Sequence, residues 1–418
     1  MTKATAETPA EAAADLQDER LIRDEGLGGA ARAFGRRVRG GDLGSLPVVI
    51  GLVVIWVVFQ VLNPNFLSAN NLVNLTLQCA AIGTISIGIV LVLLLGQIDL
   101  SVGSVSGVAA AVLGVGFTQL GWPLWVTVIV AILCGAAIGY LYGLLFTRFG
   151  VPSFVITLAG LLGFLGVQLW ILGPNSSINI PYDSWIVQFA QQTFLPPWAA
   201  YALAVIAAGG MFLSDVRRNA RRRRAGLSEG AFSVMAIKAV LLLVGLCISV
   251  WYLSTDRGTG AMFLFFVILV IVMNFFLTRT QWGRSVFAVG GSVEAARRAG
   301  IKVNRVFISV FILCSTFAAV GGLLAAARLA SVGAGSGGTD TNLNAIAAAV
   351  IGGTSLFGGR GSAWSALLGI LVIQSITNGL TLMNLDSSYR YMITGAVLLL
   401  AVIIDSLSRR SRASHGQA

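Results

Sequence analysis

Charged residues are scarce in this chain. Asp, Glu, Lys and Arg make up 11% of its 418 residues, whereas 56% are hydrophobic. A soluble domain carries about a quarter charged residues, so this composition, with a mean hydropathy of +0.85, excludes an ordinary soluble protein. The useful unit of length is therefore an apolar run of about 20 residues, enough to cross a bilayer as a helix.

Groups that carry catalysis or bind metals are also few. The only histidine is His415, and the four cysteines lie singly inside apolar runs, at Cys79, Cys134, Cys247 and Cys314. Such spacing favours packing over zinc binding or redox chemistry. We expect no catalytic residue, no cofactor-binding residue and no metal site. A membrane enzyme would need clustered His, Asp or Glu at a membrane face, and the sequence has no such cluster.

A nucleotide-binding motif is missing as well. The chain has three lysines, Lys3, Lys238 and Lys302, and none belongs to G-x-x-x-x-G-K-[ST], so it carries no P-loop. Coupling to protons would need titratable groups within the apolar runs, where they are nearly absent. We therefore expect that the energy for any transport arrives from a partner protein.

What the sequence has instead is a series of apolar runs. They predict an all-α polytopic membrane protein with about 12 transmembrane helices, some broken or re-entrant. The predicted spans are 46–62, 72–95, 100–118, 123–148, 152–172, 198–213, 232–253, 260–278, 305–328, 342–355, 362–383 and 389–407.

The net charge of +11 fits this topology better than it fits nucleic-acid binding. With the N-terminus in the cytoplasm, nearly every Arg cluster falls in a cytoplasmic loop, as the positive-inside rule requires. Both termini are then cytoplasmic. Residues 1–45 are predicted to be a disordered cytoplasmic tail without a cleaved signal peptide, 46–408 the transmembrane domain, and 409–418 a second cytoplasmic tail.

Two loops between spans each allow two interpretations. The Arg-rich loop 214–230 holds the run Arg217–Arg224, which would either anchor the topology or bind acidic lipid headgroups. The long external loop 173–197 is rich in Pro and Asn, and is either a simple exposed loop or a docking site for a partner.

Two stretches predict irregular membrane structure. Residues 96–104 (GQIDLSVGS) place Asp99 almost without a loop between two apolar runs, where it would cap a helix beginning at Leu100, line a transport path, or do both. Residues 331–362 contain glycine at a density that predicts a broken or re-entrant helix. Leu356–Ser362 also echoes Ile98–Ser104, which indicates either an internal repeat with loops near a common pathway or chance similarity.

A polar stretch, Arg279–Lys302, separates two late spans and contains a short predicted helix. Ser292 can cap its start, Glu294 lies in its first turn, Arg297 and Arg298 lie in its last turn, and Gly300 can end it. Such a helix, flanked by spans and rich in Arg, is expected to lie on the cytoplasmic face and to offer a surface to a partner.

This stretch carries a resemblance to a known family. Residues 294–300 (EAARRAG) fit E-A-A-x-x-x-G, the cytoplasmic signature of permeases of ATP-binding-cassette (ABC) importers, and residues 96–104 and 348–362 (AAVIGGTSLFGGRGS) accompany it. In this order and spacing they resemble the ribose/xylose-type branch of sugar permeases. The resemblance covers about 46–407. An extra apolar pair around the Arg-rich loop makes the chain most similar to the xylose type.

The resemblance implies a homodimeric, multi-pass permease in the prokaryotic cytoplasmic membrane. Its partners would be membrane lipid, an ATPase subunit that binds ATP and Mg, and an extracytoplasmic sugar-binding protein, with no nucleic acid. The ATPase would dock at the coupling loop, 279–304. The residues expected to couple to it are Ser292, Glu294, Ala295, Ala296, Arg297, Arg298 and Gly300.

A monosaccharide, xylose or a related sugar, would pass between the protomers. The residues expected to line its path, or to make ordinary interhelical hydrogen bonds, are Asn74, Gln78, Gln97, Asp99, Ser101, Ser104 and Asn344. Two alternatives remain open: an ABC permease for a nucleoside or an amino acid, and a secondary sugar transporter.

Overall fold

The computed structural model describes residues 46–174, 177–225 and 230–386, together with a few residues between 388 and 403. The two predicted tails, 1–45 and 409–418, and most of the last predicted span, 389–407, lie outside the described residues. The described chain forms two compact units. One is a helical hairpin within Leu195–Gly258, and the other comprises Gly44–Phe194 and Thr259–Arg409 and is called the main unit below.

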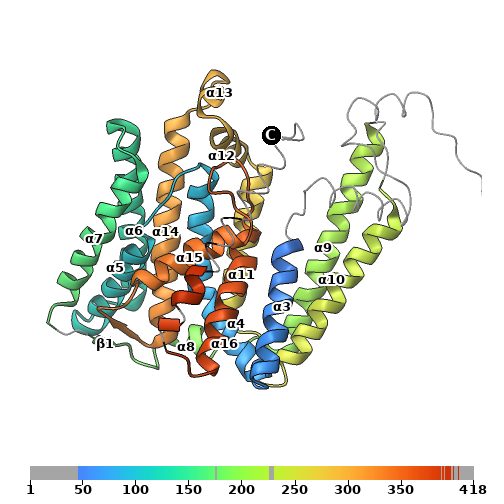
Figure 1. Cartoon of the computed structure of the whole chain (residues 1–418), viewed down its shortest axis with the longest axis horizontal. Coiled ribbons are helices and arrows are strands. Elements are labelled where there is room, and N and C mark those ends of the chain that lie inside the picture. Colours follow the sequence, from blue (N-terminus) through green and yellow to red (C-terminus); the bar gives the residue numbers. More distant parts are fainter. Residues whose placement is uncertain are drawn as a thin grey trace, which may run out of the picture. The chain divides into compact units, whose positions relative to one another are not determined.

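The main unit is built almost entirely from helices (Figure 1). In chain order its elements are α3 (Leu46–Leu62), α4 (Ala69–Leu94), α5 (Val102–Gly114), the π-helical turn η1 (Val115–Gln119), α6 (Leu124–Phe149), α7 (Ser153–Leu172), β1 (Ser177–Asn179), α8 (Trp185–Gln191), α11 (Ala261–Arg279), α12 (Gln281–Gly291), α13 (Val293–Arg298), α14 (Val303–Leu329), β2 (Ser331–Gly333), α15 (Thr339–Ile351) and α16 (Trp364–Leu382).

The predicted all-α polytopic fold is confirmed. Among the described residues, nine helices are long and apolar enough to cross a membrane, and α3 adds a shorter apolar helix of 17 residues. The predicted tenth span corresponds to α15, which has only 13 residues. At about 1.5 Å per residue such a helix is too short to cross the hydrocarbon core.

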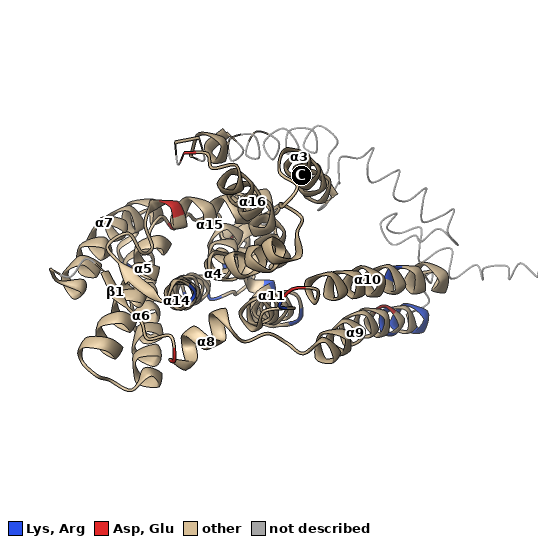
Figure 2. Ribbon diagram, turned by 90° about the horizontal axis from the view of Figure 1, so that it is seen from below, with Lys and Arg blue, Asp and Glu red and all other residues tan. Residues whose placement is uncertain are grey.

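Glycine allows the central helices to approach one another closely. In both views α14 lies between α6 and α4 (Figures 1 and 2). Gly135, Gly139 and Gly143 recur every four residues and form one face of α6. A Cβ at Gly143 would lie 2.8 Å from the Cα of Ile308, and one at Gly139 would meet the backbone of α14 at Phe311. This small-residue face substitutes backbone contact for side-chain packing, as is common between membrane helices.

The first stretch predicted to be irregular, the connection between α4 and α5, is longer than expected. The helix expected to begin at Leu100 begins at Val102, because the Asp99 carboxylate accepts a hydrogen bond from the Ser101 amide in the connecting turn. The second irregularity, 331–362, is a broken segment as the glycine density predicts. It contains β2, a glycine loop, the short helix α15 and a second glycine loop.

The segment 173–197, expected to be either a simple exposed loop or a docking site for a partner, is partly built into the main unit. Its strand β1 pairs antiparallel with β2, with Ile178 opposite Val332. Its helix α8 buries Ile186, Val187 and Ala190. An apolar stripe in this short helix explains the difference, since it can be buried against the ends of the long helices.

The hairpin unit consists of α9 (Pro197–Arg224) and α10 (Phe232–Leu253). The predicted span 198–213 is therefore too short, because α9 continues through most of the region expected as an Arg-rich loop. Four arginines lie in its last turn, where cations complement the helix dipole (Figure 2). Asn219 closes the hairpin: its side chain accepts from the Gly230 amide at 2.8 Å and donates to the Gly230 carbonyl at 2.7 Å.

The contact between α6 and α14 predicts an overpacking effect. Gly139→Leu should destabilise the main unit by about 1–3 kcal/mol, because the new side chain would displace the backbone of α14. Gly163→Leu is a matched control, since nothing lies within 4 Å of the position where its Cβ would be. Thermal unfolding in detergent, followed by monodispersity on size-exclusion chromatography, measures both. Equal melting temperatures for the two variants would contradict the packing argument.

Candidate functional site

The helix α13 lies at one end of the main unit, beyond α12 (Figure 1). Its local structure follows the expected pattern. Ser292 caps it by accepting a hydrogen bond from the Ala295 amide at 3.2 Å, and the chain leaves it through Gly300 in the left-handed region, with φ of +80°. Glycine adopts this conformation without the steric cost that other residues incur.

The side chains of α13 divide into an inner and an outer set. Ala296 is buried and anchors the helix, whereas Glu294, Ala295, Arg297 and Arg298 are exposed. Glu294 and Arg297 form an ion pair of 3.2 Å. Because this pair is exposed, it contributes little to stability, and both charges remain accessible to another protein.

A backbone junction joins α12 to the end of α4 and to the second glycine loop. The Gly359 amide donates to the Leu94 carbonyl at 2.9 Å. A Cβ on Gly290 would meet the same carbonyl, and one on Gly358 would lie 2.7 Å from the Gly290 carbonyl. The two similar segments, 98–104 and 356–362, therefore begin close together in space. A Cβ on Gly96, just before the first segment, would lie 3.3 Å from the carbonyl oxygen of Phe357 in the second.

Asp99 is the centre of a buried polar cluster. Its carboxylate accepts from the Ser101 amide at 2.8 Å and from the Ser101 hydroxyl at 2.7 Å, and the Cys314 thiol lies 3.6 Å away. The Tyr142 hydroxyl donates to Ser101 Oγ at 2.8 Å. Burial raises the pKa of the Asp99 carboxyl, and the hydrogen bonds from Ser101 and Cys314 act in the opposite direction. The cluster ties the turn before α5 to α6 and α14.

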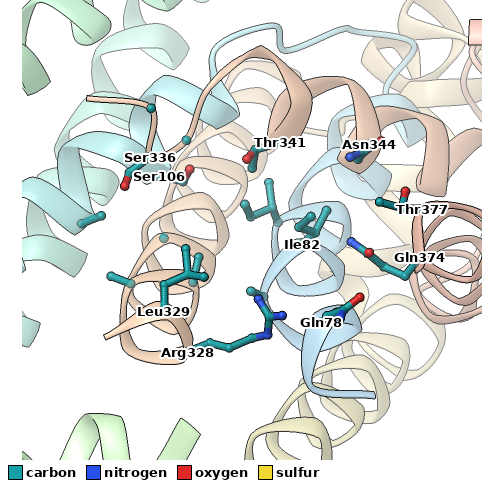
Figure 3. A pocket seen from close by; sticks show the side chains of 18 residues that line it. Gln78, Ile82, Ser106, Arg328, Leu329, Ser336, Thr341, Asn344, Gln374 and Thr377 are labelled. Atoms are coloured by element: carbon teal, nitrogen blue, oxygen red, sulfur yellow. The ribbon is translucent and has the colours of Figure 1, made fainter. Parts of the chain in front are cut away.

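A pocket of about 320 Å³ lies in the main unit among α4, α5, α14, α15 and α16 (Figure 3). This volume is at the lower end of the range for small-molecule sites, about 300–1,000 Å³. Its lining consists of small and aliphatic residues with a few polar groups. The polar side chains are those of Gln78, Ser106, Arg328, Ser336, Thr341, Asn344, Gln374 and Thr377.

Of the residues expected along the path, the structure brings Gln78 and Asn344 into this pocket. Asp99 and Ser101 belong to the buried cluster instead. Ser104 donates to the Leu161 carbonyl at 2.7 Å and so joins α5 to α7. The remaining two lie apart from the described lining: Asn74 donates to Asn70 at 3.3 Å, and Gln97 is partly buried in the turn after α4.

Sequence reasoning missed most of the polar lining. Arg328, Gln374 and Thr377 are not among the residues that the sequence predicts along the path. A signal was available, since Gln374 and Thr377 lie three residues apart within an apolar run and therefore on one face of a helix. Among the described residues, no group of three or more His, Cys, Asp or Glu is placed to hold a metal ion.

A buried glutamine, a half-buried glutamine and the small sheet position the pocket wall. Gln168 on α7 donates to the Gly333 carbonyl at 3.1 Å and the Ser336 carbonyl at 2.8 Å, which ties the first glycine loop to α7. Gln191 on α8 donates to the Arg328 carbonyl at 2.9 Å, and the Ile180 amide donates to the Ala330 carbonyl at 2.8 Å. The end of α14 is therefore fixed by β1 and α8.

Comparison with known proteins places this architecture in a family. The family described as "Branched-chain amino acid transport system / permease component" matches residues 71–402. The chain belongs to this family of permeases. It is 35% identical over 345 residues to the xylose transport system permease protein XylH of Escherichia coli (strain K12), covering 82% of this chain and 87% of that protein.

Two further relatives have names that refer to other sugars. The ribose import permease protein RbsC of Escherichia coli (strain K12) is 30% identical over 362 residues, 86% of this chain and 92% of that protein. The fructose import permease protein FrcC of Rhizobium meliloti is 30% identical over 370 residues, 88% of this chain and 86% of that protein. No solved structure matches the chain.

These matches confirm the resemblance to the ribose/xylose type of ABC permease. Relatives of this kind are permease components of transport systems rather than enzymes, and the chain is a multi-pass protein of the plasma membrane. The roles expected of α13 and of the polar residues along the path stay predictions.

The Asp99 cluster predicts a graded effect of substitution. Asp99→Ala should destabilise the permease by about 1–3 kcal/mol, because the buried Ser101 amide and hydroxyl lose their acceptor. Asp99→Asn keeps an acceptor oxygen and should cost less. Asp183→Ala in an exposed turn is the control. Thermal unfolding in detergent compares the three variants, and an Asp99→Ala variant as stable as the control would refute the structural role of the cluster.

Proposed function

We propose that this chain is the membrane subunit of an ATP-driven importer that brings a monosaccharide, xylose or a related sugar, into the cytoplasm. The observation that carries the proposal is the pocket, whose polar side chains suit a small polyhydroxylated ligand, in a permease whose relatives are named for xylose, ribose and fructose. Amide and hydroxyl groups both donate and accept, as sugar hydroxyls do.

The chemistry of the described lining also argues against the alternatives. It contains no aromatic side chain on which a nucleoside base would stack, and no Asp or Glu to pair with the ammonium group of an amino acid. It likewise offers no carboxylate that would carry a proton in a secondary transporter. A neutral sugar needs none of these groups.

The energy would come from a separate ATPase subunit that binds ATP and Mg and docks at α13. Two copies of the permease would form a homodimer, and an extracytoplasmic binding protein would deliver the sugar and provide most of the selectivity. Movement of α12 and α13 on ATP binding would reach α4 and the second glycine loop through the junction of Gly290, Gly359 and Leu94. Because α4 and α15 both line the pocket, this route links the docking surface to the sugar.

Reconstitution tests the function directly. The permease, its ATPase and its binding protein in proteoliposomes should accumulate labelled D-xylose, D-ribose or D-fructose only when ATP is supplied to the ATPase. Uptake by the permease alone that a protonophore dissipates would identify a secondary transporter instead. ATP-driven uptake of a nucleoside or an amino acid, without uptake of any sugar, would show that the transported solute is not a sugar.

The exposed face of α13 predicts a loss of ATPase binding without a loss of folding. Replacing Glu294 with Lys and Ala295 with Glu alters the charge of this face but leaves the buried anchor, Ala296, unchanged. Co-purification with the ATPase should fall at least about tenfold, as expected when charges are mismatched at a docking site.

Arg217→Glu is the matched control, an exposed charge reversal in the hairpin unit. It should co-purify with the ATPase as the unaltered chain does. All variants should reach the membrane in equal amounts and elute as monodisperse peaks. If the α13 variant still retained the ATPase, the docking assignment would be wrong.

A further inference from the structure

Arg328 is a cation without a counter-ion in the described part of the chain. It lies at the end of α14, partly buried, with its side chain extending into the pocket (Figure 3). Its guanidinium makes no hydrogen bond or ion pair with another described residue, and the described lining of the pocket contains no Asp or Glu. A guanidinium is always charged and offers five N–H donors in a rigid plane.

Two glutamines surround the same space from other helices. Gln78 on α4 and Gln374 on α16 point toward the pocket beside Arg328 (Figure 3). Gln374 is only 5% exposed, and neither side chain makes a hydrogen bond with another described residue. Gln78 and Arg328 are half-buried and Gln374 is buried, and all three line the same cavity without a hydrogen bond to another described residue, so their polar groups are available to a ligand in the pocket.

The three side chains together select for a particular kind of ligand. They present more donors than acceptors, because Arg328 accepts nothing while each glutamine both donates and accepts. The ligand must therefore bring acceptor oxygens in excess, close enough together for a planar donor fork. Two hydroxyl groups on neighbouring carbons of a sugar meet this requirement, and the glutamine oxygens can accept the hydroxyl protons.

The backbone at Arg328 is held in place, so the guanidinium extends from a fixed position. Gln191 binds the carbonyl of Arg328, and the pairing of β1 with β2 holds the residues that follow. A fixed donor discriminates among ligands more strongly than a mobile one, because a ligand that lacks the matching group leaves the fork unpaired.

We propose that Arg328 is a specificity-determining residue that contacts the transported sugar, donating paired N–H bonds to two adjacent hydroxyl oxygens between Gln78 and Gln374. The inference rests on the proposed function, since it takes the ligand of the pocket to be a monosaccharide.

Ligand-observed saturation-transfer NMR on the permease in nanodiscs, without the ATPase and the binding protein, tests this contact. D-xylose, D-ribose and D-fructose are screened at millimolar concentration, and the strongest ligand is compared with its set of monodeoxy derivatives. Arg328→Gln should weaken binding of the parent sugar about ten- to hundredfold, as expected for the loss of charge-assisted hydrogen bonds. Arg328→Lys, which keeps the charge but not the fork, should restore only part of it.

The deoxy series separates contact from architecture. The two derivatives that lack one or the other of two adjacent hydroxyls should bind weakly to the unaltered chain and lose nothing further in Arg328→Gln. The other derivatives should show the full loss. Arg257→Gln, a change in an exposed ion pair of the hairpin unit, should bind every ligand normally.

Three results would overturn the proposal. If Arg328→Gln weakened the binding of every derivative equally, Arg328 would have a structural role and would not contact the sugar. If Arg328→Gln left sugar binding unchanged, Arg328 would not bind the sugar. If none of the three sugars bound to the unaltered chain, the pocket would not be a sugar site. Each result can be told apart from a failure of the proposed function, because ATP-driven uptake by the complete transporter is measured separately.

Discussion

The structure depends on satisfying backbone polar groups where helices break inside a membrane protein. Away from water, every unpaired amide or carbonyl costs free energy, so broken helices persist only where other groups supply partners. Here those partners are specific. The Asp99 carboxylate accepts a hydrogen bond from the Ser101 amide. Gln168 donates to carbonyls of the first glycine loop, and the Gly359 amide donates to the Leu94 carbonyl of α4. Asn342 donates to the Leu100 carbonyl and so joins α15 to the turn before α5.

These bonds create the conditions for the pocket. Because α15 is short and flanked by glycine loops, it enters the main unit without crossing it and leaves space beside α4 and α16. Glycines also bring backbones into contact at the junction of Gly290, Gly359 and Leu94, where a Cβ on Gly290 would prevent the approach. A displacement of α12 therefore acts on the backbone of α4 directly, which is a stiffer connection than contact through long side chains.

The sequence was sufficient to predict the fold class, the family and the short helix α13. Apolar runs of the right length predict helices because the bilayer fixes the length, and Ser292 and Gly300 predict the ends of α13 because caps act locally. It was not sufficient for features that depend on distant partners. The role of Asp99 requires Tyr142 and Cys314, which are far away in the chain, and the strand β1 has no recognisable pattern until β2 is beside it.

The pocket was partly predictable for the same reason. Gln78 and Asn344 stand out as amides within or beside apolar runs, and they line the pocket. Ser104 has the same character, yet it is used to join α5 to α7. Residue type alone does not separate the two roles, because an amide or hydroxyl in an apolar helix can bind either another helix or a solute. Only the three-dimensional neighbours decide which role a residue has.

The charges of the described lining agree with the separation of transport from energy supply. A transporter driven by an ion gradient needs a titratable or ion-coordinating group beside its substrate, since the ion must bind where it can affect the substrate. A permease driven through α13 has no such need, and its pocket can present neutral amides and hydroxyls with a single fixed cation. The cation cannot take part in proton exchange, because a guanidinium keeps its proton at every physiological pH. The lack of a P-loop in the sequence and of carboxylates in the described lining both agree with the proposed function, in which this chain holds the solute and a separate subunit supplies the energy.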